Sequence, residues 1–308
     1  MNQKGKKNTG KKILDLITLF AKEGAQLGFG EDPGSLDDSY EDLLYNTIII
    51  DDPKNNPIAK NILVRPATTK DVEDIVKVEI KSWPVPIIEG GAMRATAEKF
   101  QNRIRIGGLL VAQYKGPKTT FTYKNNPPST LQGDMIIGMI SYQIIKCDID
   151  LEELYKKQLM DEVIIWDDLI KMGLSKDWYE ATDSGYVLKT HKPDGNTGFL
   201  IGVGITPEAR GLKLVDKLVE AVLKNAKNKG LKQVIGYERL PGFHKYSDQM
   251  SIEDYFNAKR EDTQYLDPVS RFHSRMGAKL LCTIPNAMYD DGESLGYGAL
   301  AWYDLSRL

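Results

Sequence analysis

One stretch, from Thr197 to Leu218, constrains the fold of this chain more than any other. It reads TGFLIGVGITPEARGLKLVDKL, an apolar run that ends at Thr206 and Pro207 and leads at once into an amphipathic segment. The apolar residues of that segment have helical spacing; they are Leu212, Val215, Leu218, Val219, Val222 and Ala226. The pattern predicts a buried strand that passes through a short turn into a helix, as in α/β proteins.

The turn between this strand and helix has the features of an anion site. We expect the helix to open near Arg210–Lys213, where backbone N–H groups have no partner within the helix and carry the positive end of its dipole. Such a terminus suits a phosphate or a pyrophosphate. An ordinary strand–helix connection has the same spacing, so the spacing alone leaves both interpretations open.

The composition is typical of a soluble globular protein. The chain has 308 residues, 41% of them hydrophobic, and a formal net charge of −2. The near-neutral charge and the lack of a basic stripe argue against nucleic acid as a partner. No apolar run is long enough to span a bilayer, and the N-terminus carries no pattern of a secretory signal. Cys147 and Cys282 form no metal or redox motif, so we expect a cytoplasmic location and no metal.

The chain divides by composition into an N-terminal appendage, residues 1–60, and a main domain, residues 61–308. Within the appendage, Lys11–Glu23 has the spacing of an amphipathic helix, either packed on the main domain or free to dock on a partner or a membrane surface. Glu23–Pro53 holds nine acidic residues and no Lys or Arg, which indicates a solvated flank or a surface for a basic partner. Residues 146–196 are too long for a simple connection and predict an insertion, which is either a lid or specificity loop over the catalytic face or a structural elaboration alone.

Further strands and helices follow from hydrophobic periodicity and from turn residues. We expect strands at Ile62–Thr68, Leu109–Tyr114, Met135–Ile145, Lys232–Glu238, Leu280–Ile284 and Tyr297–Tyr303. We expect helices at Ala97–Ile106, at Leu151–Met160 and between Pro268 and Gly277. A polar loop, Gly116–Gly133, separates two of the strands, and Asp267 is a candidate N-cap with Pro268 at the first helical position.

Three residues are candidates for proton transfer. His273 lies on the helix that Asp267 caps, and an imidazole can donate or accept a proton near neutral pH. Glu238 ends a predicted strand, and His244 follows the next turn; strand ends in α/β sheets border ligand crevices. The alternatives are a surface histidine bonded to a neighbour and a carboxylate in a salt bridge with Arg239.

The segments around the central turn resemble the GNAT superfamily of N-acetyltransferases. Ile205–Gly211 is similar to its strand-to-helix signature, Arg/Gln-x-x-Gly-x-Gly/Ala, and "ILVRPATTKDVEDI" resembles its first strand and helix. Arg210 fits the first signature position, whereas Lys213 and Val215 stand where the family has small residues. The resemblance implies an α/β GNAT fold with a mixed central sheet flanked by helices. It also implies a strand edge at Gly204 and Ile205 for pantetheine, and a pyrophosphate turn of Arg210, Gly211, Leu212, Lys213, Leu214 and Val215.

The C-terminal half is similar to one GNAT subgroup, which includes standalone domains, domains fused to carbon–nitrogen hydrolases and loading domains of polyketide synthases. The segments that carry this likeness are "ERLPGFH", "DPVSRFHSRMGA" and "IPNAMYDDGESLGYGALAWYD". The likeness implies that His273 acts on the thioester or thiol. It also implies that Trp83 and Arg94 border the acceptor site, and that Tyr237 lies near the position of a hydroxyl residue in the loading domains.

Together these features predict an acyltransferase that uses acetyl-CoA or a similar acyl-CoA, or a pantetheine thioester, without a metal. The acceptor would be an amine or the phosphopantetheine thiol of an acyl carrier protein. One alternative is a GNAT-like enzyme that decarboxylates or cleaves malonyl-type thioesters. Another is a non-catalytic GNAT-like binding module, which Lys213 and Val215 raise because their side chains depart from the family pattern. The sequence indicates no oligomeric state.

Overall fold

The computed structural model describes residues 48–50, 56–89, 95–123 and 128–307. The predicted helix Lys11–Glu23, most of the acidic segment and Arg94 lie outside these residues. The chain forms two compact units. Unit 1 comprises Met1–Ile62 and Tyr114–Met135, and unit 2 comprises Leu63–Gln113 and Ile136–Leu308.

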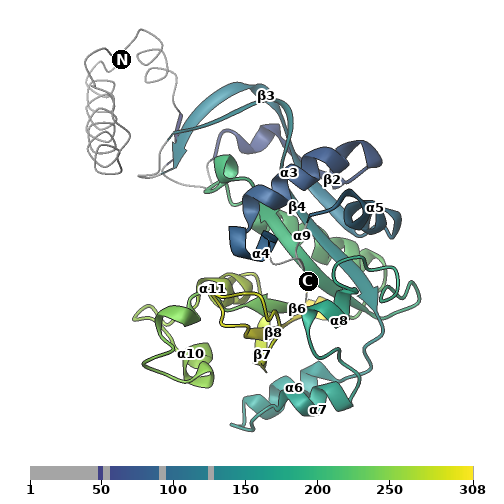
Figure 1. The fold of residues 1–308 in the computed structure, drawn as a ribbon, viewed down its shortest axis with the longest axis vertical. Coiled ribbons are helices and arrows are strands. Elements are labelled where there is room, and N and C mark those ends of the chain that lie inside the picture. The colour runs from purple at the N-terminus through teal and green to yellow at the C-terminus, as the bar shows by residue number, and fades with distance from the viewer. Residues whose placement is uncertain (1–47, 51–55, 90–94, 124–127, 308) are drawn as a thin grey trace. The chain divides into compact units, whose positions relative to one another are not determined.

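The described part of unit 1 is built on the outer parts of two long strands, β3 (Leu109–Tyr123) and β4 (Ser129–Ile145). A short strand, β1 (Ile48–Ile50), pairs in parallel with the end of β3 (Figure 1). A 3₁₀ turn, η2 (Ala59–Asn61), precedes the boundary between the units. The expectation of a polar loop at Gly116–Gly133 is wrong over most of that range, because threonine and aromatic residues there favour extended structure.

Unit 2 contains a mixed sheet in which every strand predicted from the sequence is present. Its order is β3-β4-β5-β6-β8-β7, with β2 paired to β3. The β5–β6 pair is parallel, and β4–β5, β6–β8 and β7–β8 are antiparallel. The further strands are β2 (Ile62–Pro66), β5 (Thr197–Ile205), β6 (Gln233–Arg239), β7 (Lys279–Ile284) and β8 (Gly298–Asp304).

Capping residues mark where α5 and α11, two of the flanking helices, begin. The Asp267 carboxylate accepts hydrogen bonds from the amides of Val269 and Ser270 at the start of α11, and Thr96 accepts the amide of Lys99 at the start of α5. The segment 251–261 contains a helix that the sequence reasoning missed, because its apolar stripe is short. Outside the insertion, the helices of unit 2 are α3 (Val72–Ser82), α4 (Val85–Glu89), α5 (Ala97–Arg105), α9 (Leu214–Asn228), α10 (Ile252–Asn257) and α11 (Pro268–Arg275).

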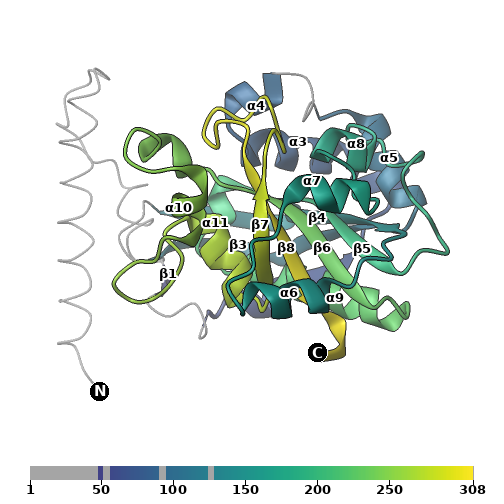
Figure 2. The same cartoon turned by 90° about the horizontal axis from the view of Figure 1, so that it is seen from below.

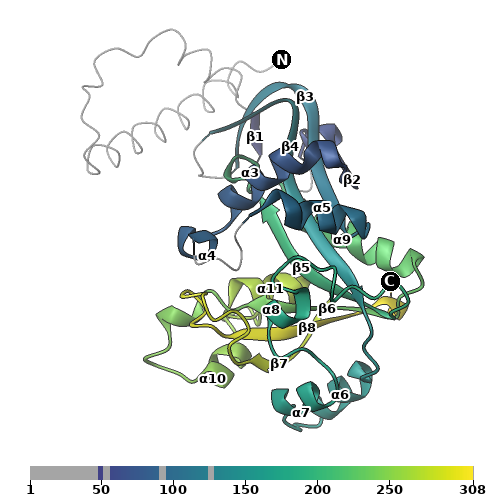
Figure 3. The same cartoon turned by 45° about the vertical axis from the view of Figure 1, so that its right-hand side comes forward.

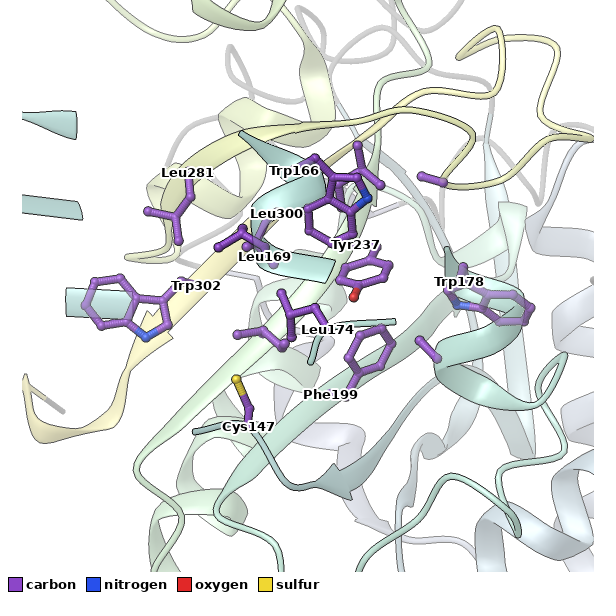
Figure 4. Packing of buried hydrophobic residues seen from close by; sticks show 14 of the residues in the cluster. Cys147, Trp166, Leu169, Leu174, Trp178, Phe199, Tyr237, Leu281, Leu300 and Trp302 are labelled. Atoms are coloured by element: carbon purple, nitrogen blue, oxygen red, sulfur yellow. The ribbon is translucent and has the colours of Figure 1, made fainter. Parts of the chain in front are cut away.

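The predicted insertion folds into three helices, α6 (Leu151–Gln158), α7 (Trp166–Lys171) and α8 (Trp178–Thr182). Figure 2 shows α6 and α7 lying across the C-terminal strands of the sheet, and both helices contact β7. Their apolar faces join the sheet in one buried cluster that includes Trp166, Trp178 and Tyr237 (Figure 4). The insertion is therefore part of the core of unit 2.

The helix after β5 begins later than the sequence suggested. Pro207–Ala209 form a 3₁₀ turn, and α9 starts only at Leu214. Gly211 and Lys213 between them have positive φ angles, +87° and +53°, which no α-helix accommodates. The first-turn amides of α9 consequently lie three residues beyond Gly211, and no side chain caps them.

Candidate active site

The site begins where two neighbouring strands part. The parallel pairing of β5 with β6 runs only from Thr197 to Leu200 (Figure 3). At the next residue the pairing with β4 is interrupted, because Ser141 pairs with Gly202 and Tyr142 with Leu200, which leaves Ile201 as a bulge. The carbonyl of Ile201 instead accepts a hydrogen bond from Trp178 Nε1, at 2.9 Å. Beyond the bulge, β5 thus presents a backbone edge toward a gap in the sheet.

This gap holds a cavity of about 260 Å³, called here the first cavity. Its walls are mostly aromatic and aliphatic, and four polar residues, Ser82, Glu238, Arg239 and His273, interrupt them. β5 contributes Leu200–Val203 and β6 contributes Gly236–Arg239. The remaining lining residues are Ser82, Trp83, Ile140, Trp178, Val219, Val269, Phe272, His273 and Met288. A largely apolar cleft with a few converging polar groups is typical of a small-molecule site.

His273 lies in the first cavity as a neutral imidazole. Burial lowers its pKa to about 4. Its Nδ1 lies 2.7 Å from the hydroxyl of Tyr303, a buried residue of β8. Among the described residues the Tyr303 hydroxyl has no other acceptor, so we assign it as the donor to Nδ1. The proton of the ring is then on Nε2.

Glu238 lies beside this imidazole and is fully buried. Its Oε1 accepts a hydrogen bond from Ser270 Oγ at 2.6 Å, whereas its Oε2 has no partner among the described residues. Oε2 lies 3.9 Å from His273 Nε2, which is too far for a hydrogen bond. Burial raises the pKa of Glu238 well above its ordinary value, which favours the protonated form of the carboxyl.

Arg239, the third polar residue of the wall, is already neutralised. Its guanidinium donates to both oxygens of Asp291, at 2.6 and 2.7 Å, and to Glu293 at 2.8 Å. It also lies over the ring of Trp83, 5.5 Å from its centroid. A salt bridge between Glu238 and Arg239, which the sequence left open as an alternative, is therefore not the arrangement found.

The predicted cofactor segment lies on β5 and on the turn before α9. A Cβ at Gly204 would come within 2.8 Å of Ser82 Oγ on α3, so this close approach requires glycine. Ile205 is the last residue of β5. In the turn, Arg210 and Lys213 are exposed and Leu212 and Leu214 are buried, with Gly211 and Val215 partly buried. Val219, one turn further along α9, lines the first cavity.

The other predicted site residues are dispersed. Trp83 and Tyr237 both line the first cavity, and Trp83 Nε1 donates to Glu79 on α3, at 3.1 Å. His244 is exposed and lies outside that lining; its Nδ1 is 2.9 and 2.8 Å from the carbonyls of Pro241 and Glu293. Arg94 is outside the described residues. The structure thus brings His273, Glu238, Trp83 and Tyr237 together and leaves His244 apart.

Four residues that line the first cavity or contact His273 and Glu238 were not predicted as site residues: Ser270, Tyr303, Trp178 and Met288. Ser270 could have been found, because it precedes His273 by three residues and so shares its helix face. The others reach the site from distant parts of the chain without a local signal. In the described part of the chain, no three His, Cys, Asp or Glu side chains are grouped to hold a metal ion. No helix there is both long and apolar enough to cross a bilayer.

Solved structures with the same architecture are known. The loading GNATL domain of CurA from Lyngbya majuscula is 22% identical, with a TM-score of 0.55, and the match covers 80% of this chain and 99% of that one. The chain has the GNAT fold. The GphF GNAT-like decarboxylase, solved with isobutyryl-CoA, is 20% identical with a TM-score of 0.54, over 79% of this chain and 99% of that one. The expected fold, mixed sheet and flanking helices included, is confirmed.

Curated relatives in Bacillus subtilis share part of the sequence. The uncharacterized N-acetyltransferase YkwB is 32% identical over 123 residues, 40% of this chain and 53% of the relative. The probable hydrolase YhcX is 34% identical over 132 residues, 42% of this chain and 25% of the relative. The chain therefore spans about half the length of one relative and a quarter of the other. No family model matches the chain.

Proposed function

We propose that this chain is a GNAT-type acyltransferase that moves an acyl group from acyl-CoA, or from a pantetheine thioester, to an amine or a carrier-protein thiol. The observation that carries the proposal is the neutral His273 in the gap between β5 and β6, with Nε2–H free of the Tyr303 contact. A cytoplasmic location and an acyl carrier protein as partner are predictions that accompany it.

The edge of β5 and the turn before α9 suggest how the donor binds. The edge of β5 beyond Leu200 has lost its β6 partner and can pair with the amides of pantetheine. The uncapped amides at Leu214–Asp216 can receive the pyrophosphate, with Arg210 and Lys213 adding positive charge. The isobutyryl-CoA bound by GphF, which has the same fold, supports this choice of donor.

His273 and Glu238 would divide the chemistry between them. The Nε2–H group of His273 donates a hydrogen bond to the thioester oxygen as it gains charge. The acceptor attacks the carbonyl carbon and loses a proton, the C–S bond breaks, and the departing sulfur takes a proton from Glu238 Oε2. The proton lost by the acceptor returns to Glu238, so the carboxyl ends each cycle unchanged. Because thioesters are activated, positioning and one proton shuttle account for most of the acceleration.

Charge favours acyl transfer over decarboxylation of a malonyl group. A malonyl carboxylate entering the first cavity would meet the neutral His273 and the protonated Glu238. The guanidinium of Arg239 is already paired with Asp291 and Glu293. The lining therefore offers no unpaired cation to compensate the cost of removing the malonyl carboxylate from water. GphF is described as a decarboxylase, so decarboxylation is the alternative reaction that an experiment must distinguish from acyl transfer.

Product analysis decides among these functions. The protein is incubated with acetyl-CoA, isobutyryl-CoA or malonyl-CoA, each with a panel of amines and with free pantetheine as thiol acceptor, and products are identified by mass spectrometry. We expect an acylated acceptor and free CoA from the uncharged donors. Release of CO₂ from malonyl-CoA, or free acid without an acylated acceptor, would support the rival enzyme. No heat of CoA binding at millimolar ligand would support a non-catalytic module.

A further inference from the structure

A second cavity, of about 300 Å³, lies beside the first under the insertion. Its apolar lining includes Leu174, Ala181, Ile145 and Phe199, and its polar lining includes the charged residues Lys146, Glu180, Lys189 and Lys192 together with Ser175 and Thr190. Tyr237 of β6 is the residue that lines both cavities. Its neighbour Glu238 points to the other face of the sheet, because successive side chains of a strand alternate. The phenol ring therefore stands between the reacting groups and the space under the insertion.

Tyr237 is held rigidly in this position. Its hydroxyl donates to the carbonyl of Ser175 at 2.7 Å. The ring packs edge-on against Trp166, at 5.3 Å between centroids, and against Phe199, at 4.9 Å. Figure 4 shows the ring enclosed by these aromatic side chains and by Leu174. A side chain fixed by a hydrogen bond and two aromatic contacts makes a firm wall.

We propose that Tyr237 is the partition between the two cavities and limits the length of the acyl chain that the enzyme accepts. The inference rests on the proposed acyltransferase function and adds its substrate class, namely short acyl groups. Trp178, Ile201 and Met288 line the first cavity and belong to the same buried cluster as Tyr237, and their apolar surfaces suit a hydrocarbon group rather than an ammonium. A chain as long as octanoyl would have to pass the phenol ring and enter the second cavity.

Two substitutions at Tyr237 test the partition. Tyr237→Ala removes the ring and joins the cavities, whereas Tyr237→Phe removes only the hydroxyl and keeps the ring as the matched control. Rates with acetyl-CoA and octanoyl-CoA give a ratio of kcat/KM for the two donors. We expect Tyr237→Ala to raise the octanoyl-to-acetyl ratio at least ~10-fold, since a single methylene in an apolar pocket is worth that much discrimination. The Tyr237→Phe ratio should stay at the wild-type value.

Binding keeps the test independent of turnover and of loss of folding. Calorimetry compares octanoyl-pantetheine with acetyl-pantetheine for each variant, after a thermal melt shows one cooperative transition. Tighter octanoyl binding by Tyr237→Ala than by Tyr237→Phe supports the partition, whether or not the variants turn over acyl-CoA. If binding changes in this way but no variant turns over acyl-CoA, the partition stands and only the proposed acyltransferase function is refuted. If octanoyl binding does not improve in Tyr237→Ala, or improves equally in Tyr237→Phe, the partition is overturned whatever the turnover. A Tyr237→Ala chain that does not melt cooperatively is replaced by Tyr237→Val, judged by the same comparison.

Discussion

The exposed turn at Arg210–Val215 and the buried pair of His273 and Glu238 are built in opposite ways. The turn comes from one continuous segment, with charged side chains in solvent and bare amides at a helix start. The buried pair is assembled from β6 and α11, and burial is the largest cause that shifts the pKa of both groups toward their neutral forms. In the turn, the attraction for a phosphate group is therefore electrostatic, and each exposed contact is weak. The chemistry of the buried pair depends instead on where its protons lie, and burial keeps water away from them.

This contrast predicts that changes to the buried pair act on kcat and that changes to the turn act on KM. In the proposed mechanism the buried groups meet the reacting atoms, so their contribution would appear in the transition state. The turn would hold a part of the donor that does not react, and its contribution is the same in the ground and transition states. The variants below test this division, in order of the size of the effect.

The largest loss is expected from His273→Ala. It removes the N–H donor to the thioester oxygen, and kcat should fall at least ~10-fold, while the dissociation constant for CoA stays unchanged. His244→Ala is the matched control, because His244 is exposed and lies outside the cavity lining. Turnover with acetyl-CoA and calorimetry with CoA measure the two quantities. Unchanged turnover in His273→Ala would remove this residue from the mechanism.

The free energy of unfolding should depend on pH through His273 and Glu238, and the two residues act in opposite directions. The lowered pKa of His273 means that the unfolded chain binds more protons below about 6.5, so stability falls as the pH drops toward 4. The raised pKa of Glu238 means that the unfolded carboxyl ionises above about 4.5 while the folded one keeps its proton, so stability falls as the pH rises.

Glu238→Gln isolates the second of these terms. It keeps the size of the side chain and cannot ionise, so it should gain stability relative to the wild type as the pH rises. We expect the difference in Tm between the variant and the wild type to be larger at pH 8 than at pH 5, because only the wild-type carboxyl ionises in the unfolded chain. Glu220→Gln, on the exposed face of α9, should show no such trend. A difference that does not change with pH would mean that Glu238 is ionised in the folded protein.

The sequence predicted the parts of this site that arise locally. Asp267 before Pro268 fixed the start of α11 and thereby the place of His273, and the apolar run after Thr197 marked β5. The start of α9 was misplaced because Lys213 adopts a left-handed conformation that a lysine seldom takes. The signature position that Lys213 occupies belongs to glycine in the family it resembles, and this was the one local hint of the conformation.

Contacts between distant segments could not be predicted. Tyr303 approaches His273 only because β8 inserts between β6 and β7, and Arg239 meets Asp291 across the loop before β8. Neither pair has a characteristic spacing in the sequence, because each contact is created by tertiary packing. The protonation states of His273 and Glu238 follow from burial, which a sequence pattern does not measure. The sequence thus named His273 and Glu238, which line the first cavity, and missed Ser270 and Tyr303, which contact them.

A smaller effect on kcat is expected from Tyr303→Phe. The ring packing remains, but the hydroxyl no longer donates to Nδ1 of His273, so the imidazole is free to change tautomer. Loss of one hydrogen bond of about 1 kcal/mol corresponds to a roughly fivefold fall in kcat, with KM unchanged. The donated hydrogen bond also disfavours a proton on Nδ1, so its loss should raise the pKa of His273 and move the acid limb of the pH–rate profile upward. Equal changes in kcat and KM, without a shift in that profile, would indicate a purely structural role.

The smallest effect is expected in the turn, from Lys213→Ala. Lys213 is exposed, and an exposed ion pair between a lysine and an anion contributes up to about 1 kcal/mol. KM for acetyl-CoA should therefore rise roughly two- to fivefold at low ionic strength, with kcat unchanged, and the rise should vanish in about 1 M salt. Pantetheine thioesters lack the pyrophosphate, so the substitution should leave their KM unaffected, which makes acetyl-pantetheine the internal control. A salt-independent rise with both donors would show that Lys213 shapes the turn instead of attracting the phosphates.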